Sequence, residues 1–157
     1  MPVNTKTVEG RRKLRFESLD DILKDIDSLE GKKLKSLGNR SVGQNLAHLA
    51  IAANGAIDGF KMQVPWIFKV VGRLFKSKLL NGTMPPGFKL KPEGEAVLWP
   101  GDPTEAEGFA ALRKAIARLK TESHREPSPF FGPMSIEDHN QLACRHCELH
   151  LSFIVPE

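Results

Sequence analysis

Tyrosine is missing from the sequence, and only two cysteines are present. The first absence rules out tyrosine acid–base catalysis. The cysteines, Cys144 and Cys147, are too few and too close together to form the disulfide framework of a small secreted domain. No apolar run approaches the roughly 18 to 20 residues of a membrane-spanning helix, and no apolar segment of a secretory signal follows the basic start. We therefore expect a cytoplasmic protein.

A strong excess of one charge is also lacking. The 157 residues include 23 Lys and Arg against 19 Asp and Glu, for a formal net charge of +4. Acidic and basic residues are interleaved except in a basic stretch from Lys61 to Lys78, unlike the concentrated basic face of a dedicated nucleic-acid binder. The 40% hydrophobic and 27% charged residues are typical of a globular chain. We expect one domain, 15–157, after a flexible segment, 1–14.

Four long segments carry apolar residues at helical spacing, and none shows the alternation of a strand. Each predicted helix starts at a capping residue followed three positions later by an acidic or amide residue: Ser18 and Asp21, Ser41 and Gln44, Asp102 and Glu105, Ser135 and Asp138. The first helix is expected to end before Gly31, the second near Lys61 and the last near Ile154. Such helices bury their apolar stripes most simply against each other, which predicts an all-α four-helix bundle.

Two further segments lie between the second and third of these helices. Residues 66–80 form an extra basic amphipathic piece after Pro65, in which apolar side chains alternate with lysine and arginine. Residues 81–101 contain four prolines and four glycines, so we expect a long irregular crossover loop. Its apolar residues Met84, Phe88 and Trp99 are candidates for a lid over a binding site.

The histidines of the last predicted helix share one face. His146 and His150 are spaced i, i+4, so their rings lie on successive turns and can converge on one cation, and His139 projects to the same side. Leucines also occupy this face, so it is directed at the core. A third ligand can come from His48 on the second predicted helix, where small residues leave room beside the ring.

A structural or solvent-exposed role is the alternative for each of these residues. A single histidine near a core is more often a hydrogen-bonded structural residue than a ligand, and His124 in a loop is expected to be solvated. Cys144 and Cys147 form a C-x-x-C pattern, but they lie in mid-helix rather than at the helix N-terminus that favours a redox thiolate. We expect them to be reduced packing residues.

Three segments carry a resemblance to a known family: SVGQNLAHLAIA around His48, the loop MPPGFKL, and the closing RHCELHLSF with its HxxxH spacing. They resemble the DinB/YfiT-like superfamily of metal-dependent enzymes, and more closely one of its uncharacterised branches, over the chain from about Arg15 to Pro156. The resemblance implies a four-helix bundle in which His48, His146 and His150 hold a divalent zinc, nickel or iron ion.

Characterised members include thiol S-transferases that use low-molecular-weight thiols such as bacillithiol or mycothiol, and a thiol-dependent isomerase. Many relatives carry an aromatic residue in place of His139 and a glutamine in place of Phe153. These departures leave the pocket chemistry open, and they leave His139 either as a residue supporting the ligands or as an extra ligand.

Two functions from different classes therefore follow. The first is a metal-dependent thiol S-transferase or hydrolase acting on a small electrophile, in which a water or thiol on the ion is the nucleophile and no catalytic side chain is assigned. The second is a non-catalytic binding or oligomerisation module that uses the basic helix 66–80. The expected partners are a small-molecule substrate and a second copy in a homodimer; neither nucleic acid nor a membrane is expected.

Overall fold

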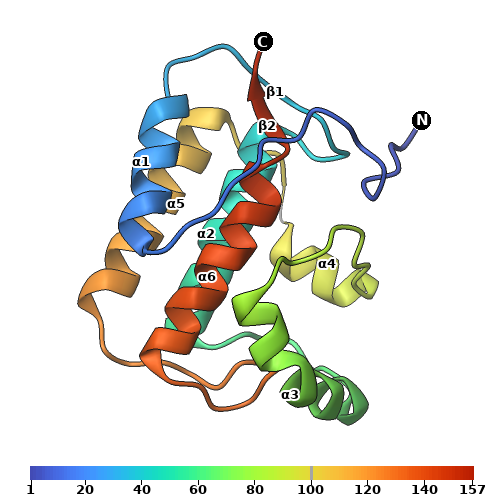
Figure 1. Ribbon diagram of the computed structural model, residues 1–157, viewed down its shortest axis with the longest axis vertical. Coiled ribbons are helices and arrows are strands. Elements are labelled where there is room, and N and C mark those ends of the chain that lie inside the picture. Colours follow the sequence, from blue (N-terminus) through green and yellow to red (C-terminus); the bar gives the residue numbers. More distant parts are fainter. Residues whose placement is uncertain (100) are drawn as a thin grey trace.

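The structure, a computed structural model, describes residues 1–99 and 101–157 and is mostly helical, as expected from the sequence (Figure 1). The described helices are α1 (Leu19–Leu29), α2 (Val42–Asp58), α3 (Trp66–Asn81), α4 (Pro92–Leu98), α5 (Glu105–Thr121) and α6 (Ile136–Leu151). Two short strands, β1 (Leu34–Ser36) and β2 (Ile154–Pro156), pair antiparallel. Among the described residues, no helix has the length and apolarity required to cross a membrane.

Side-chain caps start the four helices α1, α2, α5 and α6. Ser18 and Asp21 form the predicted capping box of α1, Ser41 and Gln44 form that of α2, and Ser135 accepts a hydrogen bond from the backbone of Asp138 at the start of α6. The predicted start of α5 at Asp102 is wrong. Thr104 caps this helix, with the carboxylate of Glu107 returning a bond to the Thr104 backbone. The Thr104–Glu107 box overlaps the predicted Asp102–Glu105 pattern and caps the helix two residues later, so Pro103 lies in the segment before the helix.

Three other local predictions are wrong. The second predicted helix ends at Asp58 rather than near Lys61, because Gly59 follows with a positive φ of 84°. The segment 81–101 is not irregular throughout, because α4 occupies Pro92–Leu98 with proline at its first position. The last helix ends at Leu151 rather than near Ile154, and the residues that follow form β2 against β1. Strands of three residues are too short to show alternation, and their pairing joins segments more than 100 positions apart in the chain.

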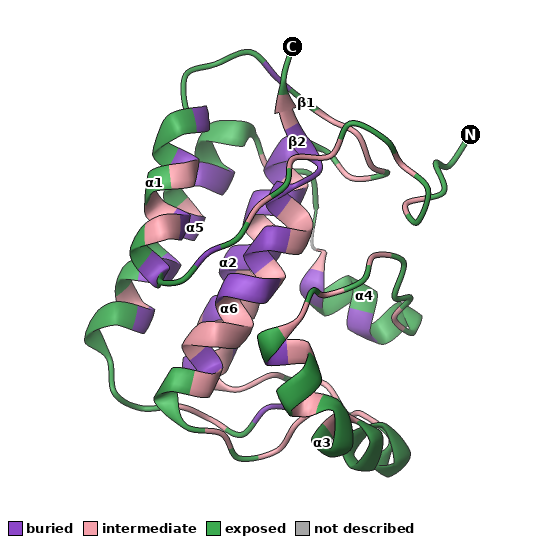
Figure 2. Cartoon of the chain, in the orientation of Figure 1, coloured by how far each residue is buried: buried purple, intermediate pink, exposed green. Residues whose placement is uncertain are grey.

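One hydrophobic core lies between α1, α2, α5 and α6, whose buried sides face one another (Figure 2). Cys144 and Cys147 belong to this core as free thiols. The starts of α2 and α5 approach each other very closely: a Cβ atom on Gly43 would lie 2.0 Å from the carbonyl oxygen of Pro103, and one on Gly108 would lie 3.0 Å from that of Gly43. Glycine at both positions permits this contact, which sets how closely α2 and α5 pack at their starts.

The basic helix α3 forms as predicted but lies at the margin of the molecule, outside this core (Figure 1). Leu80 is its buried residue, while its other large apolar side chains are exposed or half-buried. In Figure 2 the helix is exposed over most of its surface.

Candidate metal centre

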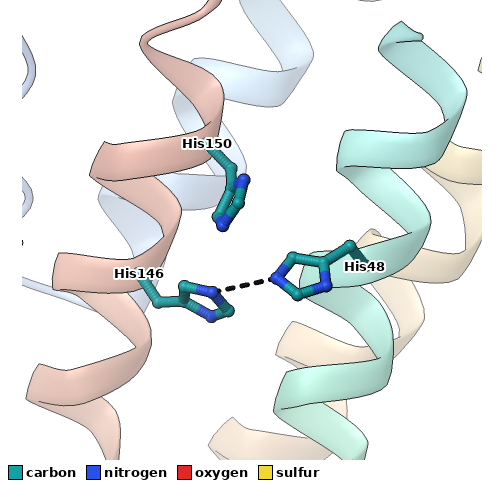
Figure 3. Close-up of side chains that lie close together, drawn as sticks. All are labelled: His48, His146 and His150. Atoms are coloured by element: carbon teal, nitrogen blue, oxygen red, sulfur yellow. Dashed lines mark hydrogen bonds between the residues drawn. The ribbon is translucent and has the colours of Figure 1, made fainter. Parts of the chain in front are cut away.

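The structure brings together the three histidines that the sequence singled out (Figure 3). His48 projects from the middle of α2, and His146 and His150 project from successive turns of α6. One ring nitrogen of each lies within 4.8 Å of those of the other two, and the Nε2 atoms of His48 and His146 are 3.1 Å apart. Ligands on one tetrahedral ion with metal–nitrogen bonds of about 2.0 to 2.1 Å stand a little over 3 Å apart. The His48–His146 pair matches this distance, and the wider separations in the triad, up to 4.8 Å, would have to shorten on binding.

The other ring nitrogens of two of these histidines are held by fixed acceptors. Nδ1 of His48 lies 3.0 Å from the carbonyl oxygen of Leu98, and Nδ1 of His150 lies 3.2 Å from Oδ1 of Asn45. A carbonyl oxygen only accepts, so each Nδ1 carries the hydrogen and each neutral ring presents its lone pair at Nε2. Metal-binding histidines commonly donate their second ring N–H to a carbonyl or carboxylate in this way.

Burial keeps the triad uncharged. Desolvation lowers the pKa of His48 to about 4, and the charge of Arg40 acts in the same direction. Desolvation also lowers the pKa of His146 to about 3, and the neighbouring His48 adds to this effect. The pKa of His150 is also well below its usual value, chiefly through desolvation and then through His146, His48 and Arg11. Neutral imidazoles are the form that binds metal, so protons do not compete for these nitrogens near pH 7.

A tryptophan covers one side of the triad. The Trp99 ring stacks on His48 with centroids 3.9 Å apart and planes within 3°, and it meets His150 edge-on at 5.5 Å. The guanidinium of Arg40 lies 4.8 Å from the centroid of the Trp99 ring and pairs with Glu95 of α4 at 3.0 Å. The segment that ends α4 therefore supplies both the Leu98 carbonyl and the indole. Of the other candidate lid residues, Met84 is half-buried and exposed Phe88 packs against Phe130.

His139 lies outside the cluster of three histidines. It is buried near the start of α6, two turns before His146, and the group of close donor atoms in the described part of the chain consists of the other three histidines. Desolvation lowers its pKa, as does the charge of Arg125. His139 is thus close to α5–α6 loop residues such as Arg125, and the sequence could not distinguish this position from that of a ligand because both share a helix face.

The cysteines and the nearby carboxylate face other parts of the core. Desolvation raises the pKa of Cys144 to about 11 and that of Cys147 well above its ordinary value, so both remain thiols. This agrees with a packing role. Glu148 is buried, pairs with Arg145 at 3.0 Å and accepts the backbone N–H of Phe16 at 2.6 Å. Glu148 and Arg145 thus hold the N-terminal segment at Phe16 against α6.

Two groups that orient the triad were not predicted from the sequence. Asn45 precedes His48 by three positions, a spacing that places both on one face of α2, and this signal was available in the sequence. The Leu98 carbonyl was not detectable, because a backbone acceptor leaves no residue type to recognise and its segment was expected to be irregular.

A family model described as "Protein of unknown function (DUF1569)" matches residues 8–157. No significant match was found among curated proteins or among solved structures.

Proposed function

This chain belongs to the DUF1569 family of proteins of unknown function, and from its site we propose that it is a metal-dependent enzyme whose divalent ion is held by His48, His146 and His150. One observation carries the proposal: three neutral imidazoles from two helices converge, and two of them are anchored through Nδ1 so that Nε2 is free for the ion. Three nitrogen ligands leave a coordination position open, which is typical of catalytic rather than structural sites.

The fold supports placing the chain with the DinB/YfiT-like enzymes. Four helices, α1, α2, α5 and α6, share one core, and the triad comes from the second and the last of these four. This is the arrangement that the resemblance of the histidine segments implies. The basic helix α3, the short α4 and the two-stranded sheet are additions to it.

The reaction we propose is transfer of a small thiol to an electrophile, or hydrolysis. When bound, a divalent ion with an open position would lower the pKa of a thiol or a water at neutral pH. The chain's own nucleophiles are poorly suited, because Cys144 and Cys147 are buried with raised pKa values and Glu148 is engaged with Arg145. A low-molecular-weight thiol or water therefore fits the role of nucleophile better.

Residues around the triad would bind and shield the substrate. The positive charges of Arg11 and Arg40 act on the triad histidines, which favours a thiol or electrophile that carries negative charge. Trp99 shields one side of His48 from water, as expected of a lid. The Trp99→Ala variant should retain the ion but lose substrate affinity or turnover; unchanged kinetics would remove the lid from the proposal.

Metal content tests the proposal directly. The protein, expressed without a histidine tag, is expected to contain about one zinc, nickel or iron per chain by elemental analysis. The variants His48→Ala, His146→Ala and His150→Ala should each lose the ion. His124→Ala is the matched control, since His124 is exposed and pairs with Glu126. A metal-free parent that stays metal-free after reconstitution contradicts the proposal.

Activity is then screened on the metal-loaded protein. Thiols are paired with alkyl halide, epoxide and activated ester electrophiles, and thiol consumption and ester hydrolysis are followed separately. Turnover that disappears in His146→Ala and persists in His124→Ala identifies the reaction class. Stoichiometric metal without turnover of either kind would leave the metal site intact and contradict the transferase and hydrolase assignment.

A further inference from the structure

Helix α3 presents its apolar side to solvent. Large apolar side chains cover the side that faces away from the body, and their exposed fractions are high: Trp66 75%, Ile67 53%, Phe68 47%, Val70 48%, Val71 45%, Leu74 76% and Phe75 54%. Contiguous exposed apolar surface of this kind marks an interaction site. We call these seven residues the α3 apolar face.

The other side of α3 is the one that contacts the protein. A Cβ atom on Gly72 would lie 2.2 Å from the carbonyl oxygen of Phe130, Lys76 pairs with Asp138 at 2.9 Å, and Leu80 is buried. Positions 72, 76 and 80 are four apart and define one stripe along the helix. The helix is therefore turned so that glycine and lysine face the body while the large apolar residues face outward.

Every charged residue in and around α3 is basic. Residues 59–92 contain no aspartate or glutamate, and their seven basic residues are Lys61, Lys69, Arg73, Lys76, Lys78, Lys89 and Lys91. This local charge exceeds the net charge of +4 of the whole chain, so the remaining residues are net acidic. Interleaving of charge thus holds along most of the chain and fails at the helix whose apolar side is exposed.

We propose that α3 and its flanking residues dock the protein on a membrane surface that contains anionic lipids. A helix that lies in the membrane interface buries one apolar side among the lipids while lysine and arginine near its edges meet anionic headgroups. Trp66 and the two phenylalanines supply the aromatic side chains that favour this interface. The proposal goes beyond the metal site and departs from the sequence-based expectation that no membrane is involved.

The charges favour a membrane over the other occupants. Pairing of two α3 helices would bring together two segments of seven basic residues each, of which Lys76 alone is described as paired with Asp138, so the two segments repel. Nucleic acid would satisfy the charges but would leave the outward Ile67, Val71 and Leu74 without apolar contact. An anionic bilayer surface accommodates both the α3 apolar face and the positive charges around it.

Vesicle co-sedimentation with the full chain tests the proposal. We expect binding to phosphatidylcholine vesicles that contain about 30 mol% phosphatidylglycerol, at least roughly tenfold weaker binding to phosphatidylcholine alone, and a clear loss at high salt. Leu74→Glu and Lys78→Glu should each weaken binding. Their matched controls are Val3→Glu and Lys114→Glu, which change exposed residues of the same kinds outside α3 and should bind as the parent does.

Several results would overturn the proposal. Absence of vesicle binding, or binding equally affected by the control variants, contradicts it. A dimer by sedimentation equilibrium that Leu74→Glu dissociates identifies a second copy as the occupant. Binding of a DNA or RNA oligonucleotide that Lys78→Glu weakens and Leu74→Glu leaves unchanged identifies nucleic acid. His146→Ala should bind vesicles normally, so this test fails or succeeds independently of the metal site.

Discussion

Asn45 orients His150 through an amide whose direction is fixed by the chain itself. Its Nδ2 donates to the backbone carbonyl oxygens of Ser41 at 2.9 Å and Arg40 at 3.3 Å, which turns Oδ1 toward Nδ1 of His150. The amide therefore determines which nitrogen of His150 is free for the ion.

Removing this acceptor should weaken metal binding. We expect Asn45→Ala to lower the affinity by about 10- to 100-fold, measured by competition with a chelator of known affinity. Asn45→Asp keeps an acceptor for His150 and should bind close to the parent. Asn54→Ala, on the same helix but bonded to Arg118, is the control. Equal affinity of Asn45→Ala and the parent would show that the amide serves the helix start alone.

His48 makes the stability of the metal-free protein depend on pH. Its folded-state pKa of about 4 lies below the ordinary value of 6.5, so the unfolded chain binds a proton that the folded chain excludes. The contribution of the neutral His48 ring to the unfolding free energy is fully present above pH 6.5 and is lost as the pH falls toward 4.

Urea unfolding in the presence of chelator measures this dependence. Over this range the unfolding free energy should fall with decreasing pH by up to about 1.4 kcal/mol per pH unit for one such histidine. His48→Gln should have a shallower slope than the parent, and His124→Gln should have the parent's slope. A parent whose stability is flat between pH 4 and 6.5 would contradict the assigned burial of the ring.

At the scale of elements, α2 is positioned by its close approach to the start of α5. The backbone of Pro103 and Thr104 occupies the space where a side chain on Gly43 would lie. Because His48 follows Gly43 by little more than one turn, this contact also sets the position of a proposed metal ligand.

Gly43→Ala should therefore destabilise the protein by about 2 kcal/mol or more, although alanine is the better helix former. Denaturant unfolding measures the change. Gly94→Ala is the matched control, because a Cβ there meets the flexible end of Met62 at 3.3 Å and the change should lie within about 1 kcal/mol of the parent. An unchanged unfolding free energy in Gly43→Ala would mean that α2 and α5 can move apart without loss of stability.

At the scale of the whole molecule, the ion would link two elements from distant parts of the chain. His48 and His146 are 98 positions apart, and a ligand that binds the folded state alone stabilises that state. With free zinc at 100 times its dissociation constant, the unfolding free energy should rise by about 2.7 kcal/mol, or roughly 5 to 10 °C in Tm.

Thermal unfolding followed by circular dichroism checks this expectation. Magnesium, which prefers oxygen ligands, should leave the Tm of the parent unchanged, and zinc should leave the Tm of His146→Ala unchanged. An equal zinc shift in the parent and in His146→Ala would place the ion elsewhere on the protein.

Local patterns in the sequence determined the long helices and the triad. The Ser18, Ser41 and Ser135 caps, the apolar stripes and the shared face of His146 and His150 all depend on neighbours within a few positions, which helical periodicity relates directly. The pairing of His48 with this face needed one further inference: that helices with apolar stripes pack together, so that a polar ring with small neighbours faces another.

Tertiary structure decided the remaining features. The short strands pair residues more than 100 positions apart, the Leu98 carbonyl and Trp99 reach His48 from another segment, and α3 turns its apolar side outward. None of these follows from periodicity, because an amphipathic helix shows which of its sides is apolar but not what that side meets. That choice depends on the combined shape of the packed elements, here on the backbone of Phe130 pressing against Gly72.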